Sequence, residues 1–198
     1  MKRIKEIIAK EIEAISSIPL DNSIELAVDE IYEAVHENRG KVIISGMGKA
    51  GHIGYNIAMT LSSTGTPSVF LHPSEAQHGD LGILQDEDIL IVISNSGKTR
   101  EIIELIDLAK GLNFSITTIS ITGNNESEVA KKSDVRISIG EQEEICPLGL
   151  TPTASTTAMT VIGDILVILL MEKINFTKEE YASRHHGGYL HLKATGQV

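Results

Sequence analysis

The chain has 198 residues, of which 41% are hydrophobic and 4% aromatic, and its formal net charge is −10. This length fits one domain with a large aliphatic core, and the negative charge argues against a nucleic-acid or anionic-membrane partner, because both need a basic surface. A single cysteine, Cys146, excludes an internal disulfide and fits a reducing compartment, so we expect a cytoplasmic protein. The charged N-terminus does not resemble a signal segment, and the longest apolar run, 158–171, is shorter than the ~20 residues that span a bilayer.

Apolar residues at helical spacing predict two helices ahead of the first strand, over residues 2–17 and from about 22 to 36. Asn22 and Glu25 have the spacing of a capping box at the start of the second helix. The two helices have no sheet face assigned to them, and two positions remain open: they cover the sheet or they pack on a second subunit.

Five short apolar runs follow, separated by turn residues and mostly by helical stretches. The runs are 41–45, 68–71, 89–94, 115–122 and 135–139. The helical stretches between them are 52–63, 99–112 and 127–132. Continuous apolar runs of this length are typical of parallel strands covered on both faces, so the pattern predicts an α/β fold around a five-stranded parallel sheet.

A hydroxyl-rich segment then opens a long helix, which we expect over residues 153–173. From Ala158 onward this helix is apolar on nearly every side, which indicates burial on all sides. Because one sheet covers only one face of a helix, we predict an oligomer with this helix at the interface. A last short helix from Thr177 leads to a polar segment that contains His185 and His186.

The segment 94–99, Ser-Asn-Ser-Gly-Lys-Thr, joins a buried strand to an amphipathic helix. The free N–H groups and the positive dipole end of that helix favour an anion, and three hydroxyls add donors. Simple helix capping is the alternative, but a cap needs one hydroxyl and this turn has three. We interpret the segment as a phosphate-binding turn.

A glycine turn at residues 46–51 follows the first strand, and Gly46, Gly48 and Gly51 have the spacing of a dinucleotide-binding turn. NAD binding is therefore an alternative. Lys49 is an unusual residue to aim at a pyrophosphate, and no acidic residue closes the following strand, so the pattern disfavours NAD.

Two histidines and two acids lie in the polar segment 72–80, and His72, His78 and Asp80 are compatible with a metal site by ligand type alone. Ligands of parallel sheets bind beyond the carboxyl ends of the strands. By this rule, one edge of the sheet should carry the glycine turn with Lys49, the histidine segment 72–80, residues 94–99 and residues 122–123. Their convergence favours the phosphate interpretation.

Motifs at 46–49, 94–97 and 152–157 resemble those of the sugar isomerase (SIS) domain. Segments 46–54, 63–68, 72–82 and 146–150, and the histidine before Gly187-Gly188, are more narrowly similar to the arabinose-5-phosphate isomerase family over about residues 1–192. The resemblance implies a three-layer αβα sandwich, doubly wound in the flavodoxin-like manner, and a homotetramer. It also implies one SIS domain over 1–198 in the short form without CBS modules. Its parts are N-terminal helices 2–38, a sheet core 41–139, a buried helix 153–173 and an active-site tail 177–192.

The resemblance further implies interconversion of D-ribulose 5-phosphate and D-arabinose 5-phosphate through an enediol, feeding synthesis of the lipopolysaccharide sugar Kdo, with no metal or redox cofactor. The family's catalytic positions match Lys49, Glu101, Glu144 and His185. We assign Glu144 as the carbon base, His185 to ring opening or oxygen proton transfer from its own or a neighbouring subunit, Lys49 to the oxyanion and Glu101 to orienting its neighbours.

Hydroxyl, amide, glycine and histidine residues of the same edge are the expected substrate and phosphate contacts. They are Ser45, Gly48, His78, Ser94, Asn95, Ser96, Thr99, Ser155 and Thr156, with His72 and His186 as further candidates.

Two departures from the family pattern bear on these assignments. Lys98 stands where an acidic residue is common, and His185-His186 replaces a histidine followed by proline, so either histidine is open as the acting one. We interpret Cys146 as a packing residue rather than a nucleophile, because enediol chemistry needs no thiolate. A non-catalytic sugar-phosphate sensor and an isomerase of another ketose phosphate are the two competing functions.

Overall fold

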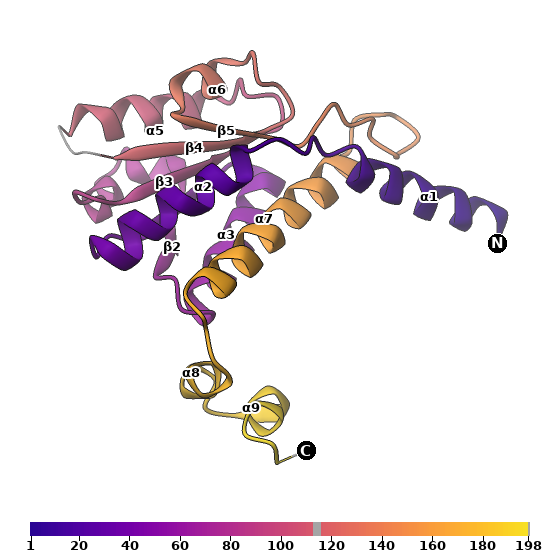
Figure 1. Cartoon of the computed structure of the whole chain (residues 1–198). Coiled ribbons are helices and arrows are strands. Elements are labelled where there is room, and N and C mark those ends of the chain that lie inside the picture. The colour runs from indigo at the N-terminus through magenta and orange to yellow at the C-terminus, as the bar shows by residue number, and fades with distance from the viewer. Residues whose placement is uncertain (113–115, 198) are drawn as a thin grey trace.

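The computed structural model describes residues 1–112 and 116–197. A sheet of five parallel strands lies between two layers of helices (Figure 1), which confirms the predicted α/β sandwich. In the order β2-β1-β3-β4-β5, the strands are Ser68–Phe70, Val42–Gly46, Ile89–Ile93, Thr117–Thr122 and Val135–Ser138. The predicted start of the fourth strand, Ser115, lies outside the described residues.

Alternate residues of each strand divide the core between the two faces of the sheet. Ile44 of β1 packs in one hydrophobic cluster and Ile43 in the other. Three helices cover the Ile44 face: α2 (Ser23–Tyr32), α3 (Gly48–Ser63) and α7 (Ala154–Lys173). Three others cover the Ile43 face: α4 (Pro73–Ala76), α5 (Arg100–Gly111) and α6 (Glu128–Lys132).

The chain changes direction at β1, because β2 pairs on one side of this strand and β3 on the other. The segments that leave β1 and β3 at the carboxyl edge therefore run to opposite faces of the sheet. In open parallel sheets this switch point leaves a crevice in which ligands bind.

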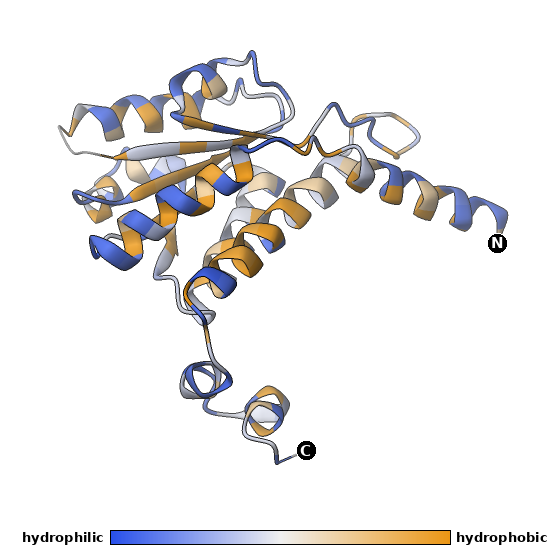
Figure 2. Cartoon of the chain, in the orientation of Figure 1, coloured by the Kyte–Doolittle hydropathy of each residue, from blue (hydrophilic) through white to orange (hydrophobic). Residues whose placement is uncertain are grey.

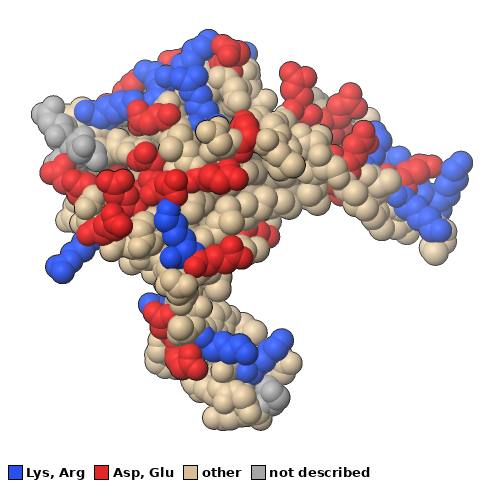
Figure 3. All heavy atoms as spheres, in the orientation of Figure 1, with Lys and Arg blue, Asp and Glu red and all other residues tan. Residues whose placement is uncertain are grey.

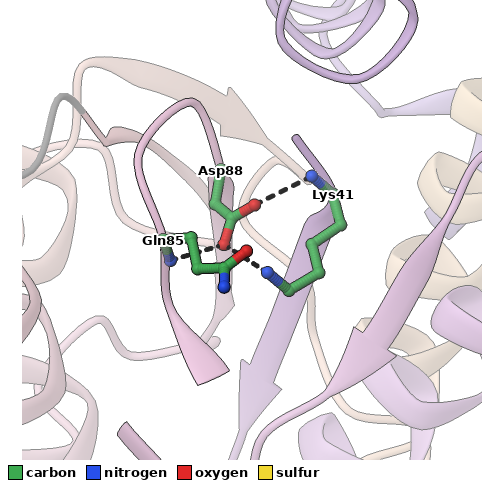
Figure 4. Close-up of polar contacts among 3 residues, drawn as sticks. All are labelled: Lys41, Gln85 and Asp88. Carbon is green, nitrogen blue, oxygen red and sulfur yellow. Dashed lines mark hydrogen bonds and ion pairs between the residues drawn. The ribbon is translucent and has the colours of Figure 1, made fainter. Parts of the chain in front are cut away.

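A buried carboxylate joins β1 and β3 at the opposite, amino edge (Figure 4). Asp88 is 1% exposed, and it accepts hydrogen bonds from the backbone N–H groups of Lys41 at 2.9 Å and Gln85 at 2.8 Å. The Lys41 ammonium lies 2.7 Å from the same carboxylate. A buried charge is tolerated only when it is paired and hydrogen-bonded, so these contacts hold the two strands in register.

Helix α7 is buried on one face only, which corrects the prediction of burial on all sides. Figure 2 shows that the helix is apolar nearly all round, yet Ile168 is 52% exposed because only one face of α7 packs against the rest of the chain. Its 20 residues have the length and mean hydropathy of a membrane-spanning helix, but half of the most apolar window is buried inside the chain. Core helices of soluble proteins share this property.

Two segments extend away from the sheet (Figure 1). The first is α1 (Lys2–Ser16), which joins the rest of the chain where Ala14 packs on Ile145 and Ala154. The second is a C-terminal arm after α7 with two short helices, α8 (Lys178–Arg184) and α9 (Gly188–Ala194). Of the two N-terminal helices, only α2 covers the sheet. Helix α9 occupies a stretch for which the sequence analysis predicted no helix.

The capping box predicted at Asn22 is not formed. Asn22 makes no side-chain capping bond, and the N–H of Ser23 donates to Asp21 Oδ1 at 2.9 Å instead. A capping box forms at Thr177, whose side chain accepts from the Glu180 N–H while Glu180 accepts from the Thr177 N–H. Two short turns complete the elements, a π-helical turn at Glu33–Glu37 after α2 and a 3-10 turn at Asp80–Ile83.

Helix α3 begins at Gly48, four residues earlier than the predicted start at His52. The early start brings the first turn of the helix against the end of β1. A Cβ atom on Gly51 would lie 2.5 Å from the carbonyl oxygen of Gly46, so only glycine permits this approach.

We expect Gly51→Ala to lower the free energy of unfolding by about 1–3 kcal/mol, because the added methyl meets rigid backbone. Urea unfolding measures the change. Gly111→Ala is the matched control, since a Cβ there meets nothing within 4 Å. Equal stability of the two variants would contradict the close approach.

Candidate functional site

A cleft of about 310 Å³ opens at the carboxyl edge, at the switch point between β1 and β3. Its walls come from the β1–α3 turn, the β3–α5 turn and the first turns of α7. The lining residues are Met47, Lys49, Ala50, Ile93, Ser94, Asn95, Ser96, Thr99, Pro152, Ser155, Thr156 and Met159. The structure therefore brings together seven of the residues predicted from the sequence.

The β3–α5 turn is held in one conformation by its own hydrogen bonds. Ser94 Oγ lies 2.8 Å from Thr99 Oγ1, and Ser96 Oγ accepts the N–H of Lys98 at 3.2 Å. Gly97 has φ +61°, and a Cβ atom there would overlap the Ser127 hydroxyl. Thr99 is the N-cap of α5 but makes no side-chain capping bond, so capping alone does not account for the hydroxyls.

Lys49 is the second residue of α3, and its side chain is exposed at the cleft. Of the described residues that line the cleft, Lys49 alone carries a charge. A cation near a helix N-terminus is unfavourable because the helix dipole is positive there. An anion bound in the cleft would offset this cost.

Glu144 lies behind the cleft, where its carboxylate holds the start of α7. Oε2 accepts from the Thr153 N–H at 2.6 Å and from the Thr153 hydroxyl at 3.0 Å, and Oε1 accepts from the Ser155 hydroxyl. Partial burial acts to raise the pKa of Glu144, but the hydrogen bonds from Ser155 and Thr153 outweigh it, so the pKa lies below its ordinary value. Glu144 is therefore ionised at neutral pH.

The loop that carries Glu144 is closed by two further contacts. The N–H of Ile145 donates to Thr153 Oγ1 at 3.0 Å. The partly exposed Cys146 Sγ accepts the N–H groups of Leu150 at 3.3 Å and Thr151 at 3.1 Å. These donors lower the pKa of the Cys146 thiol to about 7.

Several predicted residues lie outside the cleft lining. His72 and His78 are exposed around α4, and Glu101 is partly exposed in the first turn of α5. Ser45 is fully buried in β1, and its hydroxyl has no partner among the described residues. Over residues 1–112 and 116–197, no three His, Cys, Asp or Glu side chains gather closely enough to hold a metal ion. Gly48 begins α3 beside the lining residues.

His185 is not brought to the cleft of its own chain. Its ring stacks on Tyr181 with centroids 3.8 Å apart, and Nδ1 lies 2.9 Å from the Tyr181 carbonyl oxygen. Both residues lie on the arm beyond the C-terminal end of α7 (Figure 1), while the cleft lies at the N-terminal end. A helix of 20 residues spans about 30 Å. His186 is exposed on the same arm.

The apolar part of the lining was not predicted from the sequence; it is Met47, Ala50, Ile93, Pro152 and Met159. Apolar residues carry no chemical signal of their own. Met159 could be inferred from helical spacing, because it lies four residues after Ser155 on the same face of α7.

The family model of the SIS domain matches residues 36–169. The chain belongs to the SIS domain family. Arabinose 5-phosphate isomerase KdsD of Pseudomonas aeruginosa is 49% identical over 158 residues, covering 80% of this chain and 48% of that protein. KdsD of Escherichia coli (strain K12) is 44% identical over 191 residues, covering 96% of this chain and 56% of that protein. This SIS domain chain therefore spans about half the length of these curated relatives.

Two solved structures are similar over nearly the whole chain. A Bacteroides fragilis protein, proposed to be a phosphosugar isomerase involved in capsule formation, is 58% identical with a TM-score of 0.93, covering 95% of this chain and 98% of that one. An E. coli CFT073 protein in complex with arabinose 5-phosphate is 35% identical with a TM-score of 0.83, covering 93% of this chain and 96% of that one.

The lowered pKa of Glu144 predicts a pH-dependent contribution to stability. The ionised carboxylate stabilises the folded chain above the ordinary pKa of 4.5, and this contribution is lost as the pH falls through the lowered folded value. We expect Glu144→Gln to be less stable than the native chain at pH 7 by about 1 kcal/mol, with the difference shrinking below pH 4.5.

Urea unfolding at pH 7 and at two pH values below 4.5 measures this difference. Glu143→Gln is the matched control, because Glu143 is exposed one residue away. A stability difference that grows as the pH falls would contradict the proposed role of the carboxylate.

Proposed function

We propose that this SIS domain interconverts D-ribulose 5-phosphate and D-arabinose 5-phosphate through an enediol, supplying the synthesis of Kdo for lipopolysaccharide or capsule. The observation that carries the proposal is one cleft with a hydroxyl-rich turn, a lysine and a neighbouring ionised glutamate. A structure 35% identical over 93% of the chain is in complex with arabinose 5-phosphate, which supports the substrate class.

The phosphate end of the sugar is assigned to Ser94, Ser96 and Thr99. Their turn offers hydroxyl donors beside the free N–H groups of the first turn of α5, the usual environment of a bound phosphate. Lys49 lines the same cleft from α3.

Aldose–ketose isomerisation moves a proton between C1 and C2 and develops negative charge on the carbonyl oxygen. We assign the proton transfer to Glu144, which is ionised at neutral pH, through the Ser155 hydroxyl: Ser155 Oγ takes the carbon-bound proton while its own proton passes to Glu144 Oε1. Lys49 is assigned to the developing oxyanion and Glu101 to orienting its neighbours at the start of α5. The chemistry assigned to these side chains requires no metal or redox cofactor.

We infer a cytoplasmic homotetramer in which the C-terminal arm brings His185 to the cleft of a neighbouring subunit. Two surfaces support an oligomer. Ile4, Ile8 and Ile12 of α1 are 53–58% exposed, and the outer face of α7 leaves Ile168 uncovered. Large apolar surfaces of this kind are typical of subunit contacts.

The purified chain is expected to convert D-ribulose 5-phosphate into D-arabinose 5-phosphate, measured by chromatography of the products. Lys49→Met is expected to lower kcat by about 100-fold, because the oxyanion loses its cation. Lys98→Met is the matched control, since Lys98 is exposed two residues before α5 and outside the cleft lining.

Three outcomes of this assay separate the functions. No turnover, but a thermal shift with sugar phosphates, would favour a sensor. Turnover of a hexulose or heptulose phosphate in place of ribulose 5-phosphate would favour another isomerase. Equal loss in the Lys49 and Lys98 variants would contradict the assignment of Lys49.

Glu144→Gln and His185→Ala are each expected to lower turnover by about 100-fold or more, because each removes a proton-transfer group. If the arm serves a neighbouring cleft, refolding the two inactive variants together should restore up to about a quarter of native turnover, since that share of sites combines two intact groups. Near-native turnover of Glu144→Gln would contradict the base assignment. Mixed variants that form hetero-oligomers without activity would contradict the shared site.

A further inference from the structure

Two hydroxyl groups at the start of α7, those of Ser155 and Thr156, line the cleft as hydrogen-bond acceptors. Ser155 Oγ lies against Glu144 Oε1, an ionised oxygen that only accepts, so the Ser155 proton points to Glu144. Thr156 Oγ1 lies 2.7 Å from the carbonyl oxygen of Thr153, which also only accepts. A hydroxyl has one proton and two lone pairs. Ser155 and Thr156 therefore offer lone pairs, and no proton, to a ligand in the cleft.

The opposite wall offers protons. Ser96 Oγ accepts the N–H of Lys98, so its own proton is free. Ser94 and Thr99 share one hydrogen bond, which leaves one of their two protons for a ligand. Lys49 adds an ammonium group with three donors. The two walls of the cleft thus have opposite hydrogen-bonding character.

The distribution of charge distinguishes the same two walls of the cleft. The Glu144 carboxylate accepts the Thr153 N–H at 2.6 Å, so an anion of the chain itself already occupies the N-terminus of α7. A phosphate beside Ser155 would lie one hydrogen bond from this carboxylate and be repelled by it. The N-caps of α5 and α3, Thr99 and Met47, make no side-chain capping bonds. The N-termini of α5 and α3 remain available to an anion.

We propose that Ser155 and Thr156 determine specificity by accepting hydrogen bonds from the hydroxyl groups of the open-chain sugar, while the phosphate lies against residues 94–99. The proposal rests on the proposed function, and it separates Ser155 and Thr156 from the phosphate contacts with which the sequence analysis grouped them. Phosphate oxygens are acceptors and find no free proton on the Ser155 and Thr156 hydroxyls, whereas each sugar hydroxyl has a proton to donate. The pair therefore selects a polyol chain over a bare anion.

Two ligands test the phosphate part and the sugar part of the site separately. They are inorganic phosphate, and D-arabinitol 5-phosphate, which has the hydroxyl chain but no carbonyl group to react. Calorimetry measures the Kd of each for the native chain and for Thr156→Val, which removes the hydroxyl at nearly constant volume. The Thr153 carbonyl keeps the Thr157 N–H as a partner at 3.0 Å, so this variant leaves no orphaned acceptor. Thr156→Ser, which keeps the hydroxyl, is the matched control.

Thr156→Val is expected to raise the Kd of D-arabinitol 5-phosphate about three- to tenfold and to change the Kd of inorganic phosphate by less than about twofold. Ser155→Ala should act in the same way, and Thr156→Ser should bind both ligands as the native chain does. Ser96→Ala should raise the Kd of both ligands, because it removes a hydrogen-bond donor to the phosphate. Thermal unfolding checks that each variant is folded.

Equal weakening of both ligands by Thr156→Val would overturn the proposal, and so would a native chain that binds inorganic phosphate but not D-arabinitol 5-phosphate. These binding measurements do not depend on turnover. A chain that discriminates the two ligands as expected, but does not isomerise ribulose 5-phosphate, would refute the proposed function and leave the assignment of the two walls intact.

Discussion

The whole site depends on the change of chain direction at β1. Because all five strands are parallel, their carboxyl ends meet at one edge, and the switch between β1 and β3 sends the following turns to opposite faces of the sheet. The crevice between them is lined by the start of α3, which carries Lys49, and by the hydroxyl-rich turn ahead of α5. Asp88 holds the same two strands together at the amino edge, so the geometry of the crevice is anchored at the far end of the strands.

The third wall of the cleft comes from a part of the chain that follows the sheet. Glu144 connects the loop after β5 to the N-terminus of α7 through Thr153 and Ser155. This carboxylate holds the start of α7 beside the cleft and fixes the direction in which the Ser155 hydroxyl donates, while the Thr153 carbonyl oxygen fixes that of Thr156. Glu144 thereby sets the position and the charge of this wall and part of its hydrogen-bonding character.

The single chain leaves much of its apolar surface uncovered. Helix α1 and the C-terminal arm extend from the sheet, and Figure 3 shows lysine and arginine side chains at the outer end of α1 while acidic side chains gather on the face near α2. The isoleucines of α1 and the outer face of α7 are exposed in this arrangement. Burial of these surfaces against further copies would account for an amphipathic helix and an arm that contribute little to the core of their own chain.

The sequence by itself determined the five parallel strands, the hydroxyl-rich turn at 94–99 and the glycine-rich connection that carries Lys49, because periodicity, helix starts and glycine spacing act over a few residues. The predicted residues Lys49, Ser94, Ser96, Thr99 and Ser155 do lie around one cleft. Only the tertiary structure decided that α7 is covered on one face, that His72 and His78 lie outside the lining, and that Glu144 bonds to α7. It also decided which hydroxyls accept and which donate. These features depend on contacts between segments distant in the sequence. The direction in which a hydroxyl group donates its proton is set only when its hydrogen-bond partner is in place.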